Sequence, residues 1–111
     1  MSESTRSLPT ALANPLLGAK VDDLCRRCHV RRLDVFGSSL TTRFDPQTSD
    51  YDLLVSFDEL APSRYAEAYF ELHEGLERLL GRPVDLVTAP ALRNPFFRRR
   101  IEETKVVLYA A

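Results

Sequence analysis

Apolar residues recur at helical spacing in two long segments of the chain. In the first, Leu17, Val21, Leu24 and Cys28 fall on one face. This period predicts a helix over about Pro15 to His29, with its apolar face turned toward a core.

The second helical segment has the clearest pattern. Its apolar stripe consists of Tyr65, Tyr69, Leu72, Leu76 and Leu79. The stripe predicts a helix over Ser63–Leu80, and Gly81 is a natural stop. Tyr69 is therefore expected in the core. His73 has no partner pattern, so we expect it at the surface or at an edge.

Runs rich in apolar and β-branched residues separate these segments and predict strands. The expected strands are Arg31–Phe36, Tyr51–Phe57, Val84–Thr88 and Val106–Tyr109. The Leu-Leu-Val centre of the second predicts burial on both faces. Asn94 and Pro95 predict the start of a third helix that runs to about Thr104. This alternation indicates one α/β domain, with helices packed on a small sheet of about four strands.

Length and charge limit the classes of function. The chain has 111 residues, which suits one small domain at 15–111 after a flexible leader at 1–14. No apolar run approaches the ~18 residues of a membrane span, and the N-terminus has no secretory pattern. We therefore expect a cytoplasmic protein without membrane contact. A net charge of −1 provides no global basic field, so direct nucleic-acid binding is not expected.

The segment Cys25-Arg26-Arg27-Cys28-His29 has the spacing of a c-type haem attachment site. Haem attachment requires export, for which the sequence shows no signal, and Met1 is the only methionine that could serve as an axial ligand. A zinc site would need four ligands, and there is no second cysteine pair. We therefore expect two reduced cysteines on a helix.

A Gly-Ser pair and two aspartates carry the candidate chemistry. Gly37 and Ser38 end a predicted strand and lead into a predicted short helix, Ser39–Arg43. Backbone N–H groups at such a turn can hold a phosphate, and glycine allows the anion to approach. Asp50 and Asp52 begin the next strand at i and i+2, so their carboxylates point the same way. Paired carboxylates are hard oxygen ligands that suit Mg²⁺.

Asp85 is the candidate for a third carboxylate. It lies within an apolar strand, where a lone buried charge would be costly. On a strand beside Tyr51–Phe57, its side chain can join those of Asp50 and Asp52. The alternative is an ion pair with Arg82 or with a basic residue of the last helix.

Together, these residues resemble the signature of the minimal (MNT-type) nucleotidyltransferases of the polymerase-β-like nucleotidyltransferase superfamily. The resemblance rests on Gly37-Ser38, Asp50-Tyr51-Asp52 and Asp85, and it covers about Leu17 to Ala111. The segments RFDPQTSDYDLLVSF and NPFFRRRIEETKVVLYAA are also similar to that group. The spacer between the two motifs is one residue longer than the commonest form. Leu40-Thr41-Thr42-Arg43 stands where Ala-Arg-Gly often follows Gly-Ser.

The resemblance implies a mixed sheet with flanking helices, two Mg²⁺ ions, ATP as the expected co-substrate, and transfer of a nucleotidyl group. It assigns nucleotide binding to Gly37, Ser38, Ser39 and Arg43, and metal binding and catalysis to Asp50, Asp52 and Asp85. Asp85 would also help to draw the proton from the acceptor hydroxyl.

Many members of this group act as antitoxins beside a HEPN-type RNase toxin, and some add AMP to a toxin tyrosine. The resemblance therefore implies a HEPN-type toxin as partner and a hydroxyl of that protein as acceptor. Two alternatives stay open: an antitoxin that neutralises by binding alone, and a nucleotidyltransferase for a small-molecule acceptor. A homo-oligomer is also open.

Overall fold

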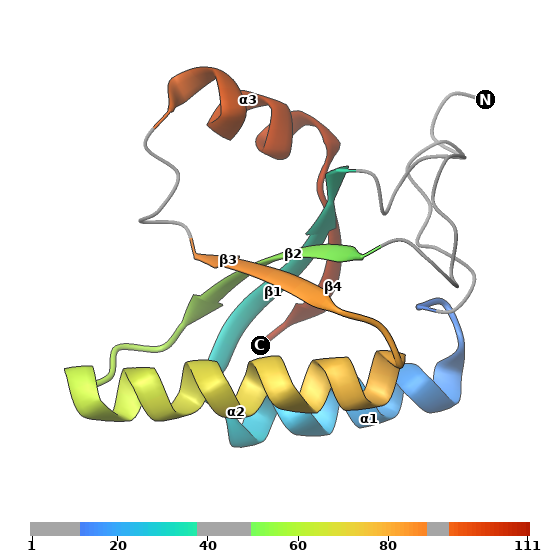
Figure 1. Ribbon diagram of the computed structural model, residues 1–111, viewed down its shortest axis with the longest axis vertical. Coiled ribbons are helices and arrows are strands. Elements are labelled where there is room, and N and C mark those ends of the chain that lie inside the picture. Colours follow the sequence, from blue (N-terminus) through green and yellow to red (C-terminus); the bar gives the residue numbers. More distant parts are fainter. Residues whose placement is uncertain (1–11, 38–49, 89–93) are drawn as a thin grey trace.

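The computed structural model describes residues 12–37, 50–88 and 94–111. Within them lie three helices and four strands (Figure 1). In chain order the elements are α1 (Pro15–Arg27), β1 (Val30–Phe36), β2 (Tyr51–Phe57), α2 (Pro62–Leu80), β3 (Val84–Thr88), α3 (Pro95–Thr104) and β4 (Val106–Ala110).

The strands form one four-stranded sheet in the order β3-β2-β1-β4. β1 pairs with both β2 and β4 in the antiparallel sense, whereas β2 and β3 run parallel. The parallel pair needs a crossover, which α2 supplies. The expectation of a small mixed sheet with flanking helices is therefore confirmed.

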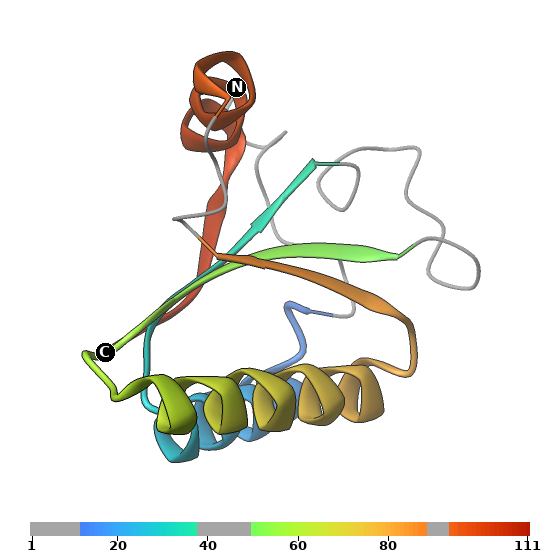
Figure 2. The same ribbon diagram turned by 60° about the vertical axis from the view of Figure 1, so that its left-hand side comes forward.

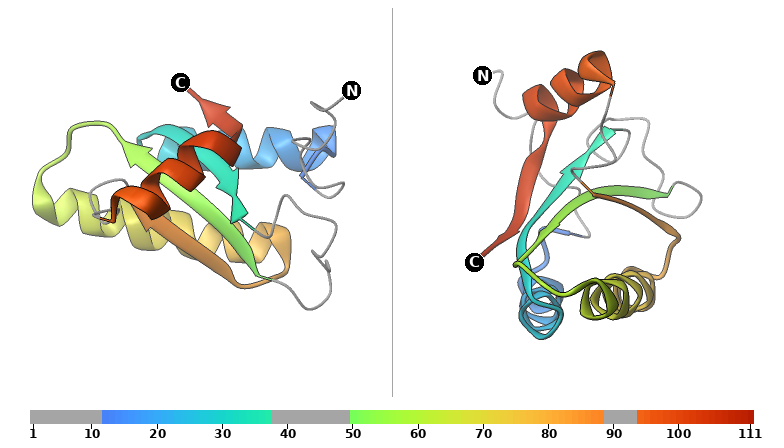
Figure 3. Two further views of the ribbon diagram at one scale, coloured as in Figure 1. Left: turned by 90° about the horizontal axis from the view of Figure 1, so that it is seen from above. Right: turned by 90° about the vertical axis from the view of Figure 1, so that its left-hand side faces the viewer.

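The helices cover the two faces of the sheet unequally. α1 and α2 lie side by side against one face, and α3 lies on the opposite side (Figures 2 and 3). Burial follows the alternation of the strands. Leu53 and Val55 of β2 join the large core beneath α1 and α2, while Leu54 packs with Phe36 and Ile101 on the α3 side. All three β2 residues are buried, which confirms the expected burial on both faces.

The ends of the elements follow local chemistry. The side chain of Asn14 accepts a hydrogen bond from the Leu16 N–H at the start of α1, and Asn94 caps α3 through the Phe96 N–H. α1 ends before His29, where we had expected it to end, because His29 has a φ of 60°. Gly81, with a φ of 68°, ends α2 as expected.

Two predictions lie outside the described residues. They are the leader, of which only Leu12 to Asn14 are described, and the short helix Ser39–Arg43. Leu12 is buried in the core. None of the helices that the structure describes is long and apolar enough to cross a membrane.

Cys25 and Cys28 are free thiols in the core, at the end of α1. Cys25 lies on α1 as expected, whereas Cys28 is the residue that caps its end. Burial raises the pKa of Cys25 to about 12 and that of Cys28 to about 11, from an ordinary value of 9.0. Both thiols therefore stay protonated in the folded chain at pH values where an unfolded chain would ionise them.

We expect stability to fall as pH rises above about 9, because the unfolded state then releases thiol protons that the folded state retains. Between about pH 8 and about pH 10.5, wild type should lose about 2 kcal/mol more than Cys25→Ala. Urea unfolding under reducing conditions measures this difference. Val21→Ala, on the same helix, keeps both thiols and should lose as much as wild type. Equal losses of stability in wild type and Cys25→Ala would contradict the raised pKa of Cys25.

Candidate active site

The parallel pairing of β2 and β3 brings two of the three candidate carboxylates together. Asp52 and Asp85 are each the second residue of their strand, and their Cα atoms are direct partners in the register. Directly paired residues project to the same face of a sheet. Across β2, Asp52 is also paired with Phe36 at the end of β1. One line across the sheet therefore joins Phe36, Asp52 and Asp85.

Gly37 lies against the carboxylate of Asp52. Its φ is 68°, and a Cβ at this position would come within 2.8 Å of Asp52 Oδ2. A side chain here would displace the carboxylate, so the site requires glycine both for its backbone conformation and for its space. The first residue of the Gly-Ser pair and the second residue of the Asp-x-Asp pair therefore meet in the folded chain.

Asp50 immediately precedes β2 and faces a cation. Arg82, in the turn between α2 and β3, places Nη2 at 3.8 Å from Asp50 Oδ1. The Asp50 side chain is 59% exposed and that of Arg82 is 26% exposed. Solvent screens such an ion pair strongly. The contact is therefore a weak attraction at the solvent-exposed side of the site.

The three carboxylates fit Mg²⁺ by ligand type, because this ion prefers hard oxygen donors. Asp52 is half-buried, whereas Asp50 and Asp85 are exposed. In the part of the chain that the structure describes, no group of three or more His, Cys, Asp or Glu side chains is arranged to hold a metal ion. The register thus joins Asp52 and Asp85, and Asp50 lies beside Arg82.

The other predicted nucleotide-binding residues, Ser38, Ser39 and Arg43, lie outside the described residues. Their assignment stays a prediction. Of the Gly-Ser pair, the structure describes Gly37, which lies next to Asp52.

A buried acid that we did not predict lies on the same face of the sheet. Asp34 of β1 is 2% exposed, and both of its carboxylate oxygens accept from Arg32 Nε, at 3.1 and 3.0 Å. Asp34 lies two residues before Phe36, in the row next to that of Asp52. The sequence signal for this pair was the i, i+2 spacing of Arg32 and Asp34, which puts both side chains on one face of a strand. A buried carboxylate is retained here because it is paired.

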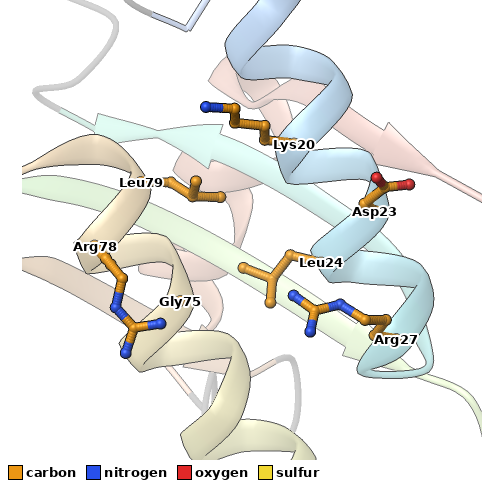
Figure 4. Close-up of a pocket in the computed structure, with 7 residues that line it drawn as sticks. All are labelled: Lys20, Asp23, Leu24, Arg27, Gly75, Arg78 and Leu79. Atoms are coloured by element: carbon orange, nitrogen blue, oxygen red, sulfur yellow. The ribbon is translucent and has the colours of Figure 1, made fainter.

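A pocket of about 300 Å³ lies elsewhere, between α1 and α2 (Figure 4). It is lined by Lys20, Asp23, Leu24, Arg27, Gly75, Arg78 and Leu79. These helices cover the sheet face that carries Leu53, Val84 and Leu86. Because side chains alternate along a strand, Asp52 and Asp85 belong to the opposite face. The pocket is therefore separate from the carboxylates.

Comparison with known proteins agrees with this geometry. The family model of the nucleotidyltransferase domain matches residues 19–108. The chain is 37% identical over 92 residues to the protein adenylyltransferase MntA of Thermococcus cleftensis, covering 83% of this chain and 89% of that protein.

Solved structures extend the agreement to the fold. One, provisionally described as a minimal nucleotidyltransferase, is 34% identical, with a TM-score of 0.64 over 80% of this chain and 86% of that one. A chain in the complex of a tri-AMPylated Shewanella oneidensis HEPN toxin with an MNT antitoxin is 23% identical. It has a TM-score of 0.55 and covers 86% of this chain and 71% of its own, a likeness that shows the fold alone. With residues 19–108 matched by the family model, this chain belongs to the nucleotidyltransferase domain family, and it has the minimal nucleotidyltransferase fold.

Proposed function

We propose that this nucleotidyltransferase transfers AMP from ATP to a hydroxyl group of a partner protein, and that it acts as the antitoxin of a HEPN-type toxin. The observation that carries the proposal is the meeting of Gly37, Asp52 and Asp85 at one end of the β2–β3 pair. The name of the Thermococcus cleftensis relative, a protein adenylyltransferase, supports AMP as the transferred group. The Shewanella oneidensis complex supports a HEPN-type partner.

The proposed roles rest on the family resemblance and, for Gly37, Asp50, Asp52 and Asp85, also on their positions in the sheet. Gly37, together with Ser38 and Ser39, holds the terminal phosphates through backbone N–H groups, and Arg43 adds positive charge. Asp50, Asp52 and Asp85 would hold Mg²⁺, which would neutralise charge on the phosphates. The acceptor oxygen attacks the α-phosphorus while the bond from that phosphorus to the bridging oxygen breaks. Pyrophosphate leaves with the electron pair, and Asp85 takes the proton of the acceptor hydroxyl.

The exposure of the site supports a macromolecular acceptor. Asp85 is exposed and lies on β3, an edge strand of the sheet, and Asp50 is exposed just before β2. A hydroxyl on the surface of a protein can reach carboxylates at such an edge. A small molecule would gain more from an enclosed pocket, which favours the protein acceptor over the small-molecule alternative.

Neutralisation by binding alone is a second candidate. One observation favours it: in residues 12–37, 50–88 and 94–111, no three acidic, histidine or cysteine side chains are arranged to hold a metal. In that case the chain would inhibit its partner without modifying it.

Asp52→Asn keeps the volume of the side chain but removes its charge. We expect label transfer from α-labelled ATP to the co-expressed toxin to fall by at least ~100-fold, the usual effect of removing a group that stabilises the transition state. The matched control is Asp58→Asn, an exposed acid just past the opposite end of β2, which should retain activity. Circular dichroism checks the fold of both variants.

The same variant separates the two candidates. If Asp52→Asn binds the toxin but no longer protects cells from it, neutralisation requires chemistry. Full protection by Asp52→Asn, without label on the toxin, would support the binding-only antitoxin and contradict the proposal.

Gly37→Ala tests the contact between the two motifs. Gly37 and Gly81 share a φ of 68°, but only a Cβ at position 37 meets another group, Asp52 Oδ2. Both alanine variants should therefore lose about 1 kcal/mol of stability through backbone strain. Because misplacing a reacting group can cost up to ~100-fold in rate, we expect label transfer to fall about 10- to 100-fold in Gly37→Ala only. A similar rate in the two variants would count against a catalytic role for the turn.

A further inference from the structure

The outer edge of β3 is bonded to side chains of α2. Glu77 Oε2 accepts from the Val84 N–H at 2.9 Å, and His73 Nε2 lies 2.9 Å from the Val84 carbonyl oxygen. The Tyr69 hydroxyl donates to the Leu86 carbonyl oxygen at 2.6 Å. An edge strand ordinarily exposes these backbone groups. Here the helix that crosses over the sheet occupies them.

Matching periods make this arrangement possible. Tyr69, His73 and Glu77 lie at i, i+4 and i+8, on one stripe of α2. Four residues of a helix advance about 6 Å, and two residues of a strand about 6.6 Å. The step from Tyr69 to His73 therefore matches the step from Leu86 to Val84, with α2 running alongside β3 (Figure 2).

The three side chains also support one another. His73 Nε2 lies 3.4 Å from Glu77 Oε2, and the ring of His73 is stacked with that of Tyr69, with centroids 6.3 Å apart. A carbonyl oxygen can only accept, so Nε2 of His73 carries the hydrogen. The stripe thus acts as a connected set, which we call the edge ladder: Tyr69, His73 and Glu77.

The edge ladder bonds the two residues that flank a candidate metal ligand: Val84 and Leu86, on either side of Asp85. Backbone groups alternate in direction along a strand, so those of Val84 and Leu86 point outward while those of Asp85 point toward β2. The Pro83 carbonyl oxygen, one residue before Val84, accepts from the Tyr51 N–H of β2, in keeping with this alternation. Asp85 is thereby held from β2 on one side and through its two neighbours from α2 on the other.

We infer that the edge ladder positions Asp85 for metal binding and proton transfer. This inference rests on the proposed function, which assigns those roles to Asp85. None of the three ladder residues touches the reacting atoms in this scheme; they are positioning residues that act through the backbone of β3. Groups that orient metal ligands typically change metal affinity 10- to 100-fold when they are removed.

The test compares Glu77→Leu with Glu77→Gln in the full chain. Leucine cannot accept from the Val84 N–H, whereas the amide oxygen of glutamine can. In Glu77→Leu we expect hydrogen exchange at the Val84 amide to rise about tenfold or more. Mn²⁺ affinity, followed by electron paramagnetic resonance of the free ion, should fall about 10- to 100-fold. Glu77→Gln should restore both properties to within about threefold of wild type.

Glu74→Leu is the matched control, because Glu74 is an exposed acid on the same helix. It should leave both readouts unchanged. Should Glu77→Leu not fold, Tyr69→Phe removes only the hydroxyl that donates to Leu86 and should also weaken Mn²⁺ binding.

The outcomes separate this inference from the proposed function. Suppose that the ladder variants bind Mn²⁺ more weakly than wild type, and that wild type labels no protein. This result would support the edge ladder and contradict the transferase proposal. Labelling by wild type with unchanged Mn²⁺ affinity in Glu77→Leu and Tyr69→Phe would overturn the ladder and leave the proposal standing. Faster exchange at Val84 without a change in Mn²⁺ affinity would also overturn it, because the ladder would then secure the strand without positioning Asp85.

Discussion

Parallel pairing of β2 with β3 requires a connection that carries the chain back along the full length of the sheet. The 19 residues of α2 provide that return. The same pairing sets Asp52 directly beside Asp85 and makes β3 an edge strand. The placement of the candidate carboxylates, the crossover helix and the exposed side of the site are therefore consequences of one strand pairing.

The division of the core explains which face carries the chemistry. α1 and α2 bury the face that includes Leu53, Val55 and Leu86, where a charged side chain would need a partner. The face toward α3 has a smaller apolar cluster around Phe36, Leu54 and Ile101, and its polar positions include Asp34 and Asp52. Asp34 is buried and paired with Arg32, whereas Asp52 lies near the start of β2, against Gly37. Burial thus separates a structural acid from one that is placed for binding.

Much of the fold could be predicted from the sequence because its signals are local. The stripe from Tyr65 to Leu79 and the caps at Asn94 and Gly81 act within a few residues, and the structure contains the elements they predicted. The pairing of Asp52 with Asp85 was expected from chemistry rather than from local pattern. The roles of Tyr69, His73 and Glu77 could not be foreseen, because each depends on the distance between a helix and a strand. Glu77 and His73 look like ordinary surface residues until Val84 is placed beside them.

The edge ladder also bears on how this domain can assemble. Extended peptides often join a protein by adding a strand to an exposed sheet edge through main-chain hydrogen bonds. At β3, the Val84 N–H and the carbonyl oxygens of Val84 and Leu86 are already taken by side chains of α2, so an incoming strand would have to displace them. Strand addition and β-type aggregation are therefore disfavoured at the β3 edge, next to the candidate site.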